Sequence, residues 1–125
     1  MPGPLHGFTI IEATQMVSGP LAAMVLADLG ADVVKIEQPD GGDRYRYLGD
    51  RRGGISAAWA NVNRGKRSVV VDLQRPAGAA VLKKLVADAD VFLQNFRPGK
   101  AAKLDIDEAS LRAVNERLVY VSISG

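Results

Sequence analysis

The chain is 125 residues long, 47% of them hydrophobic and 24% charged, with a formal net charge of +2 at pH 7. This length suits one α/β domain and is short for a two-domain enzyme, and the even mixing of cations with Asp and Glu favours a small anionic ligand over a nucleic-acid groove. No cysteine is present, which excludes disulfides, cysteine-bound metals and a thiol nucleophile.

The first predicted unit is a strand, a helix and a second strand. Phe8–Ile11 is a short apolar run, typical of a strand that is buried on both faces. Pro20 suits the first position of a helix, and we expect that helix over Leu21–Leu29, ended by Gly30. Asp32–Glu37 predicts the next strand. Strands joined by such a crossover must be parallel.

Strands and helices alternate again in the second half of the chain. The pattern predicts strands over Ser68–Val71, Asp90–Leu93 and Leu118–Ile123, and helices over Pro76–Ala87 and Glu108–Asn115. This alternation favours an α/β fold with an open, mostly parallel sheet and helices on its faces. The segment 41–66 is long and rich in Gly, Arg and Asn, and we expect it to be a functional or partner-contacting loop.

Polar motifs follow each of the first four predicted strands, in the segments 12–19, 37–43, 72–75 and 95–99. In open parallel sheets, ligands bind at the carboxyl ends of the strands, where strand order reverses. The first turn lacks the G-x-G-x-x-G pattern of dinucleotide sites, although Glu37 follows at a suitable spacing. An NAD-type site is therefore disfavoured, and a capped helix start without a ligand is the plain alternative.

Two motifs suit the phosphates and base of a nucleotide. Residues 63–67 place three cations beside a glycine, which suits charge-assisted bonds to phosphate, although a solvated run of charges gives the same pattern. Asn95, Phe96 and Arg97 offer an amide edge, a stacking ring and an anion contact, although a turn with its ring in the core is an equal alternative. We assign no catalytic role to the single His6 and find no Ser-His-Asp set, carboxylate pair or metal-ligand spacing.

Nine segments carry a resemblance when they are taken in order: Pro4–Gly7, Ser18–Pro20, Leu26–Glu37, Gly41–Asp43, Asn63–Val69, Asp72–Leu73, Ala89–Val91, Asn95–Gly99 and Leu118–Gly125. Together they closely resemble the opening of the family III coenzyme A (CoA) transferases. This group includes formyl-CoA and carnitine CoA-transferases and the α-methylacyl-CoA racemases. The resemblance covers essentially the whole chain.

The resemblance implies a Rossmann-like large domain, built as an open, mostly parallel sheet with helices on both faces. Residues 1–125 would be its amino-terminal CoA-binding part, with the small domain and the rest of the large domain outside the chain. Complete members are interlocked homodimers, so a homodimer is expected. Acyl-CoA and a carboxylic acid acceptor would be the substrates, with no permanent cofactor, metal, nucleic acid or membrane partner. Neither a signal peptide nor a membrane-spanning helix is predicted, and a cytoplasmic location is expected.

The resemblance also assigns a CoA site, position by position. Met16, Val17 and Ser18 of the first turn would face the pantetheine and thioester. Val71 and Gln74, at the end of the third strand, would flank the adenine. Asn95, Phe96 and Arg97 would hold the nucleotide part, and Lys103 would meet a phosphate.

Two positions depart from the family pattern and remove cations from the expected site. Gln38 stands where some relatives are basic, and Gln74 stands where a lysine is common. We hypothesise that Arg75, Arg64 or Lys66 replaces the missing charge.

The family mechanism, as the resemblance gives it, uses an aspartate carboxylate that attacks the acyl-CoA thioester to form a mixed anhydride. In the racemase branch, an aspartate and a histidine exchange the proton next to the thioester carbonyl. Both place the aspartate beyond residue 125, so we name no catalytic residue and expect no transferase activity from the chain alone. A racemase-type enzyme and a non-catalytic fragment or interaction module are the alternatives.

Overall fold

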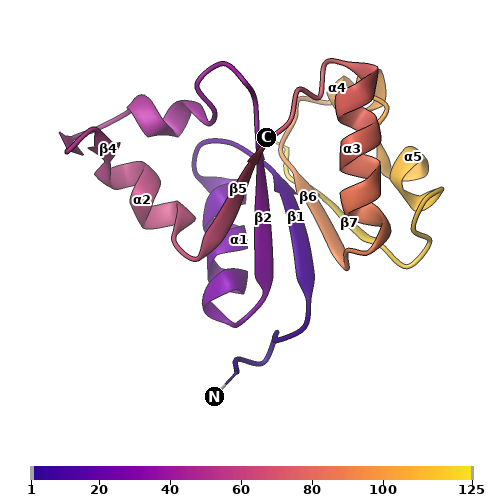
Figure 1. The fold of residues 1–125 in the computed structure, drawn as a ribbon, viewed down its shortest axis with the longest axis horizontal. Helices are drawn as coiled ribbons and strands as arrows, with labels where there is room; N and C mark the ends of the chain where they lie inside the picture. The colour runs from indigo at the N-terminus through magenta and orange to yellow at the C-terminus, as the bar shows by residue number, and fades with distance from the viewer. Residues whose placement is uncertain (1, 125) are drawn as a thin grey trace.

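The computed structural model describes residues 2–124, which fold around a five-stranded sheet (Figure 1). The strands of this sheet are β1 (Thr9–Ala13), β2 (Asp32–Glu37), β5 (Lys66–Val70), β6 (Val91–Gln94) and β7 (Val119–Ser122). The remaining elements are α1 (Ser18–Asp28), the 3₁₀ helix η1 (Arg44–Tyr47), β3 (Arg51–Arg52), β4 (Ile55–Ser56), α2 (Ala57–Asn63), α3 (Pro76–Ala87), α4 (Lys100–Lys103) and α5 (Glu108–Arg112).

All strand pairs of this sheet are parallel, and their order is β5-β2-β1-β6-β7. The chain starts at the central strand β1, moves outward through β2 to β5, and then crosses back to β6 and β7. Strand order therefore reverses between β1 and β6, which is the position where open α/β sheets bind ligands. The predicted α/β fold with an open parallel sheet is confirmed.

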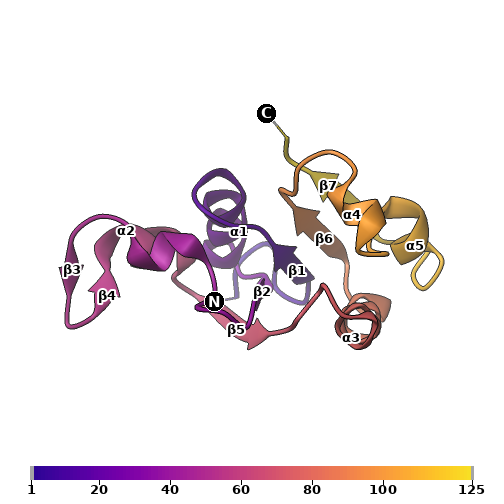
Figure 2. The same ribbon diagram turned by 90° about the horizontal axis from the view of Figure 1, so that it is seen from above.

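Helices cover both faces of the sheet, with α1 on one side and α3, α4 and α5 on the other (Figure 2). Along β1, Ile10 packs in the core cluster under α1 and Ile11 in the larger cluster under α3. Along β6, Leu93 packs in the cluster under α1 and Phe92 in the larger cluster under α3. Burial on both faces explains why these strands read as continuous apolar runs.

Some predicted boundaries were displaced by local packing. The first strand begins at Thr9, one residue after the 47% exposed Phe8, and α1 begins at Ser18 rather than Leu21. The last helix stops at Arg112, and the side chain of Asn115 instead donates to the carbonyls of Val86, in the last turn of α3, and Ala89, just after it, at 2.9 and 2.8 Å. In contrast, α3 spans the predicted Pro76–Ala87.

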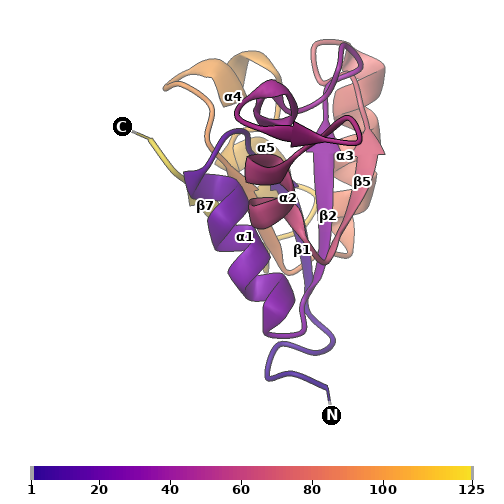
Figure 3. The same ribbon diagram turned by 90° about the vertical axis from the view of Figure 1, so that its left-hand side faces the viewer.

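The segment 41–66 is not a simple loop. It holds η1, the short β3–β4 hairpin and α2, which lie together beside α1 and beyond the β5 edge of the sheet (Figure 3). Ser56 caps α2, because its hydroxyl accepts from the backbone N–H of Trp59 at 3.2 Å. Among residues 2–124, no helix is both long and apolar enough to cross a membrane.

Candidate functional site

The residues assigned to CoA binding all follow the carboxyl ends of β1, β5 and β6, at the upper edge of the sheet in Figure 1. These residues differ in how much of each is exposed to solvent. Met16, Val17, Ser18, Gln74, Arg97 and Lys103 are exposed, Asn95 and Phe96 are half-buried, and Val71 is buried in the α3-side core.

Asn95 joins the loop after β6 to the turn after β1. Its Oδ1 accepts from the backbone N–H of Gln15 at 3.0 Å, and its Nδ2 donates to the carbonyl of the same residue at 2.8 Å. The two loops at the strand-order reversal are therefore fixed to each other. The next residue, Met16, has a φ of 69°, a left-handed conformation that is uncommon for a residue other than glycine.

A close approach of α1 to the same turn depends on Gly19. A Cβ atom at this position would lie 2.4 Å from the Cβ of Thr14 and 2.5 Å from its Cγ2. No side chain other than hydrogen fits there without displacing either the helix or the turn. Sequence reasoning found the Gly19–Pro20 helix start but not this steric requirement.

Beneath the turn lies a buried cluster of four charged side chains, Glu12, Lys35, Asp43 and Lys66, none more than 2% exposed. Lys35 Nζ is 3.1 Å from Glu12 Oε1 and 3.0 Å from Asp43 Oδ2, and Lys66 Nζ is 2.8 Å from Glu12 Oε2. The cluster balances two cations against two anions, as burial of charge requires. Desolvation by burial lowers the pKa of Lys66, although the nearby Glu12 carboxylate opposes this shift.

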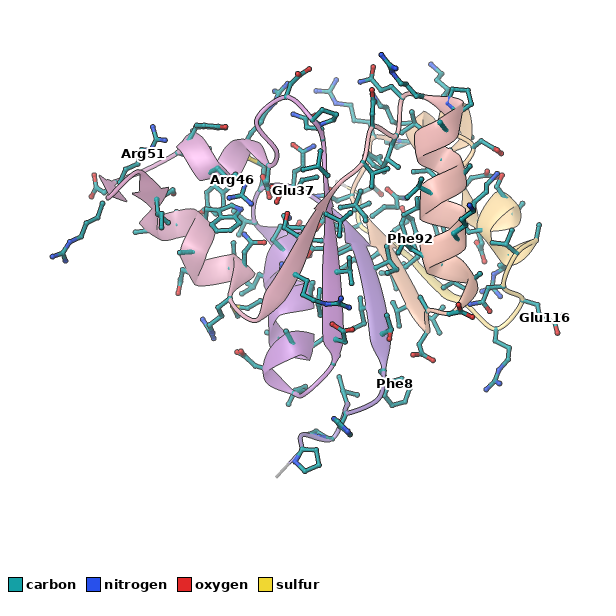
Figure 4. The ribbon with its side chains drawn as sticks, viewed as in Figure 1. Phe8, Glu37, Arg46, Arg51, Phe92 and Glu116 are labelled. Atoms are coloured by element: carbon teal, nitrogen blue, oxygen red, sulfur yellow. The ribbon has the colours of Figure 1, made fainter. Side chains whose placement is uncertain are left out.

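A third buried carboxylate, Glu37 at the end of β2, faces Arg46 of η1 (Figure 4). Arg46 Nε donates to Glu37 Oε1 at 2.8 Å, the same oxygen accepts from the backbone N–H of Asp43 at 2.9 Å, and Ser68 donates to Oε2. Burial alone would raise the pKa of Glu37, but these hydrogen bonds outweigh it and lower the pKa to about 2. Arg46 also stacks on Trp59, with its guanidinium carbon 3.8 Å from the ring centroid.

The buried cluster was missed by sequence reasoning, although a signal was present. Lys35 interrupts the apolar strand β2, and Glu12 lies within the run that forms β1. An ionisable side chain inside a strand that is buried on both faces must find a partner of opposite charge. The partners themselves come from distant segments, so spacing alone could not identify them.

A hollow of about 330 Å³ opens between the start of α3 and the end of α4. Two of the assigned residues, Gln74 and Lys103, line it together with Arg75. Lys83 also lines it and pairs with Asp105, another lining residue. The hollow thus combines cations with apolar walls.

The loop 95–97 is not part of the lining of this hollow. Phe96 packs against the α3-side core, while Arg97 is exposed. Phe96 is half-buried, so it contributes to the core as the alternative for this motif expected, while its proposed contact with the nucleotide stays a prediction.

The three cations considered as replacements for the missing charge differ in their surroundings. Arg75 lines the hollow and is exposed. The Lys66 hypothesis was wrong, because its ammonium is buried against Glu12 and cannot meet a ligand. Arg64 lies on the outer surface, paired with Asp28 at 2.7 Å. Within residues 2–124, no group of three or more His, Asp or Glu side chains is arranged to hold a metal ion.

Known proteins resemble this chain over nearly its whole length. Residues 5–125 match the family model described as CoA-transferase family III. The chain is 43% identical to the succinate–glutarate CoA-transferase of Agrobacterium fabrum, over 98% of this chain and 32% of the relative. It is 40% identical to the acetyl-CoA:oxalate CoA-transferase of Acetobacter aceti, over 98% of this chain and 32% of the relative.

A solved structure resembles the fold closely. A CAIB/BAIF family protein from Brucella suis superposes with a TM-score of 0.93 and 38% identity, covering 100% of this chain and 34% of that one. The chain thus spans about a third of the length of the proteins that it matches.

Proposed function

We propose that this chain, which belongs to CoA-transferase family III, holds the CoA carrier of an enzyme that moves CoA between an acyl-CoA and a carboxylic acid. Residues 1–125 would form the amino-terminal CoA-binding part of the large domain of a homodimeric enzyme. The relatives named for glutarate and oxalate make a small dicarboxylic acid the first acceptor to test.

The observation that supports this proposal most is the cationic hollow between the start of α3 and the end of α4, on the segments that follow β5 and β6. Arg75 and Lys103 line it and offer charge to phosphate oxygens, and Gln74 offers an amide to a base edge. The turn at Met16 lies at the same edge of the sheet, after β1. We infer that the nucleotide end of CoA lies at the hollow and its thioester end at this turn.

In the proposed reaction, an aspartate carboxylate attacks the carbonyl carbon of the acyl-CoA thioester. The C–S bond breaks, CoA leaves as a thiolate, and a mixed anhydride forms. The thiolate then attacks the aspartyl carbonyl, which releases the first acid, and the acceptor carboxylate takes over the CoA by the same steps in reverse. We assign the nucleophile to no residue of this chain, so residues 1–125 alone are expected to bind CoA without transferring it.

Binding of CoA to the chain tests the proposal directly. Isothermal titration with CoA is expected to show one site, and CoA is expected to raise the melting temperature. The substitutions Arg75→Ala and Lys103→Ala should each weaken CoA binding by roughly three- to tenfold, because each removes one charge-assisted contact with a phosphate.

Lys84→Ala is the matched control, since Lys84 is an exposed cation of α3 that does not line the hollow. This variant should bind CoA as the unchanged chain does. If the chain folds but does not bind CoA, the proposal is overturned and an interaction module is favoured instead. Equal losses in Lys84→Ala and Lys103→Ala would show that only the overall charge matters.

A further inference from the structure

The turn after β1 has a backbone conformation that its surroundings impose. Met16 has a φ of 69°, and a non-glycine residue keeps such a conformation only where neighbouring groups hold it. Asn95 holds the preceding residue, Gln15, through both its N–H and its carbonyl. These two bonds leave the amide of Met16 itself to another partner.

That partner is Asp43, whose side chain is fully buried. Its Oδ1 accepts from the backbone N–H of Met16 at 3.1 Å and from that of Tyr45 at 2.9 Å. Its Oδ2 forms an ion pair with Lys35 Nζ at 3.0 Å. Both oxygens therefore face donors, and an amide at this position would turn its NH₂ group toward one of them.

Lys35 connects this carboxylate to the floor of the turn. Its ammonium donates to the carbonyl of Thr14 at 2.9 Å and to Glu12 Oε1 at 3.1 Å, in addition to the ion pair with Asp43. The backbone of three consecutive residues, 14 to 16, is thus held by side chains from three different segments. Such a rigid support suits a turn that must meet a ligand in one geometry.

We propose that Asp43, supported by Lys35, is a positioning residue that presets the Met16 turn for the thioester end of acyl-CoA. Asp43 does not touch the substrate, because its carboxylate lies beneath the turn and is buried. This inference rests on the proposed function, and it adds that the CoA carrier is recognised in two separable parts. Only the pantetheine and thioester part depends on Asp43.

The test compares two ligands on the Asp43→Asn variant of the chain. Acetyl-CoA carries the thioester, whereas adenosine 3′,5′-bisphosphate carries only the nucleotide end. We expect Asp43→Asn to raise the Kd for acetyl-CoA by about tenfold while the Kd for adenosine 3′,5′-bisphosphate stays within about twofold. The amide of Met16 should also lose protection from hydrogen exchange, while the amides of β1 keep theirs.

Asp40→Asn is the matched control, because Asp40 is an exposed aspartate of the same loop, and it should change neither Kd. If Asp43→Asn does not fold, Asp43→Glu keeps the negative charge that Lys35 faces but moves the acceptor away from the amide of Met16, and it should show the same split between the ligands. Equal weakening of both ligands, or no weakening, would overturn the inference alone. Failure of the unchanged chain to bind either ligand would overturn the proposed function as well.

Discussion

At the scale of single residues, the Glu37 carboxylate ties the end of β2 to the segment that follows it. It is 4% exposed and accepts from Arg46, Ser68 and the backbone of Asp43. These donors favour its ionised form, so its pKa falls from 4.5 to about 2 on folding. Ionised Glu37 therefore stabilises the fold above pH 4.5, and this contribution is lost as the pH falls from 4.5 through 2.

The substitution Glu37→Gln tests this contribution. It should lower the free energy of unfolding at pH 7 by about 2 kcal/mol, because the amide cannot replace the charge that Arg46 faces. Urea unfolding at pH 7 and at pH 3 measures the effect, and the difference from the unchanged chain should shrink at pH 3. The exposed Glu116→Gln is the control and should change neither value. A difference that does not vary with pH would contradict the assigned pKa.

At the scale of secondary structure, α3 shows how a helix position shapes the candidate site. Pro76 is the first residue of α3, as the sequence predicted, and Pro20 lies in the first turn of α1, but neither proline reveals how closely its helix approaches its neighbours. In α3 this approach is set by Gly78, where a Cβ atom would lie 1.8 Å from the backbone carbonyl oxygen of Asp72. The 72–75 turn beneath it lines the hollow with Gln74 and Arg75.

Gly78→Ala should therefore displace the turn or the helix and destabilise the chain by roughly 3 kcal/mol. CoA binding should weaken in the same variant, because the lining of the hollow moves. Urea unfolding and calorimetry provide the two measurements. Ala77→Ser, an exposed change in the same helical turn, should leave both nearly unchanged. A stable Gly78→Ala chain with normal CoA affinity would mean that the turn is more adaptable than its contacts indicate.

At the scale of the whole molecule, the alternation of strands and helices was enough to predict a parallel sheet with ligand-binding loops at one edge. The order of the strands in the sheet was not predicted, because the same alternation of strands and helices is compatible with several strand orders. The support of the site was also missed, since Glu12 and Lys66 meet only after the 41–66 segment has folded back on α1. Local patterns thus pointed to the loop residues of the candidate site, which stay predictions, and not to the buried charges beneath them.

The apolar surface of α1 should make the isolated chain associate. Leu21, Val25 and Leu29 recur at every fourth residue and are each more than 40% exposed. We expect sedimentation velocity to show concentration-dependent association, which Val25→Lys reduces because it places a charge on this stripe. Val114→Lys, at an exposed site after α5, should have little effect. A strictly monomeric unchanged chain would contradict the expectation.

The chain contains three methionines, and their placement makes the supported turn directly observable. Met16 is exposed on the turn, whereas Met24 is buried within α1 at 5% exposure. Carbon-13 labelling of the methyl groups would therefore place one spectroscopic probe where the acyl carrier is expected to arrive and a second where the interior stays unchanged. The Met16 methyl signal would report on ligand binding, and the Met24 methyl signal would serve as an internal reference.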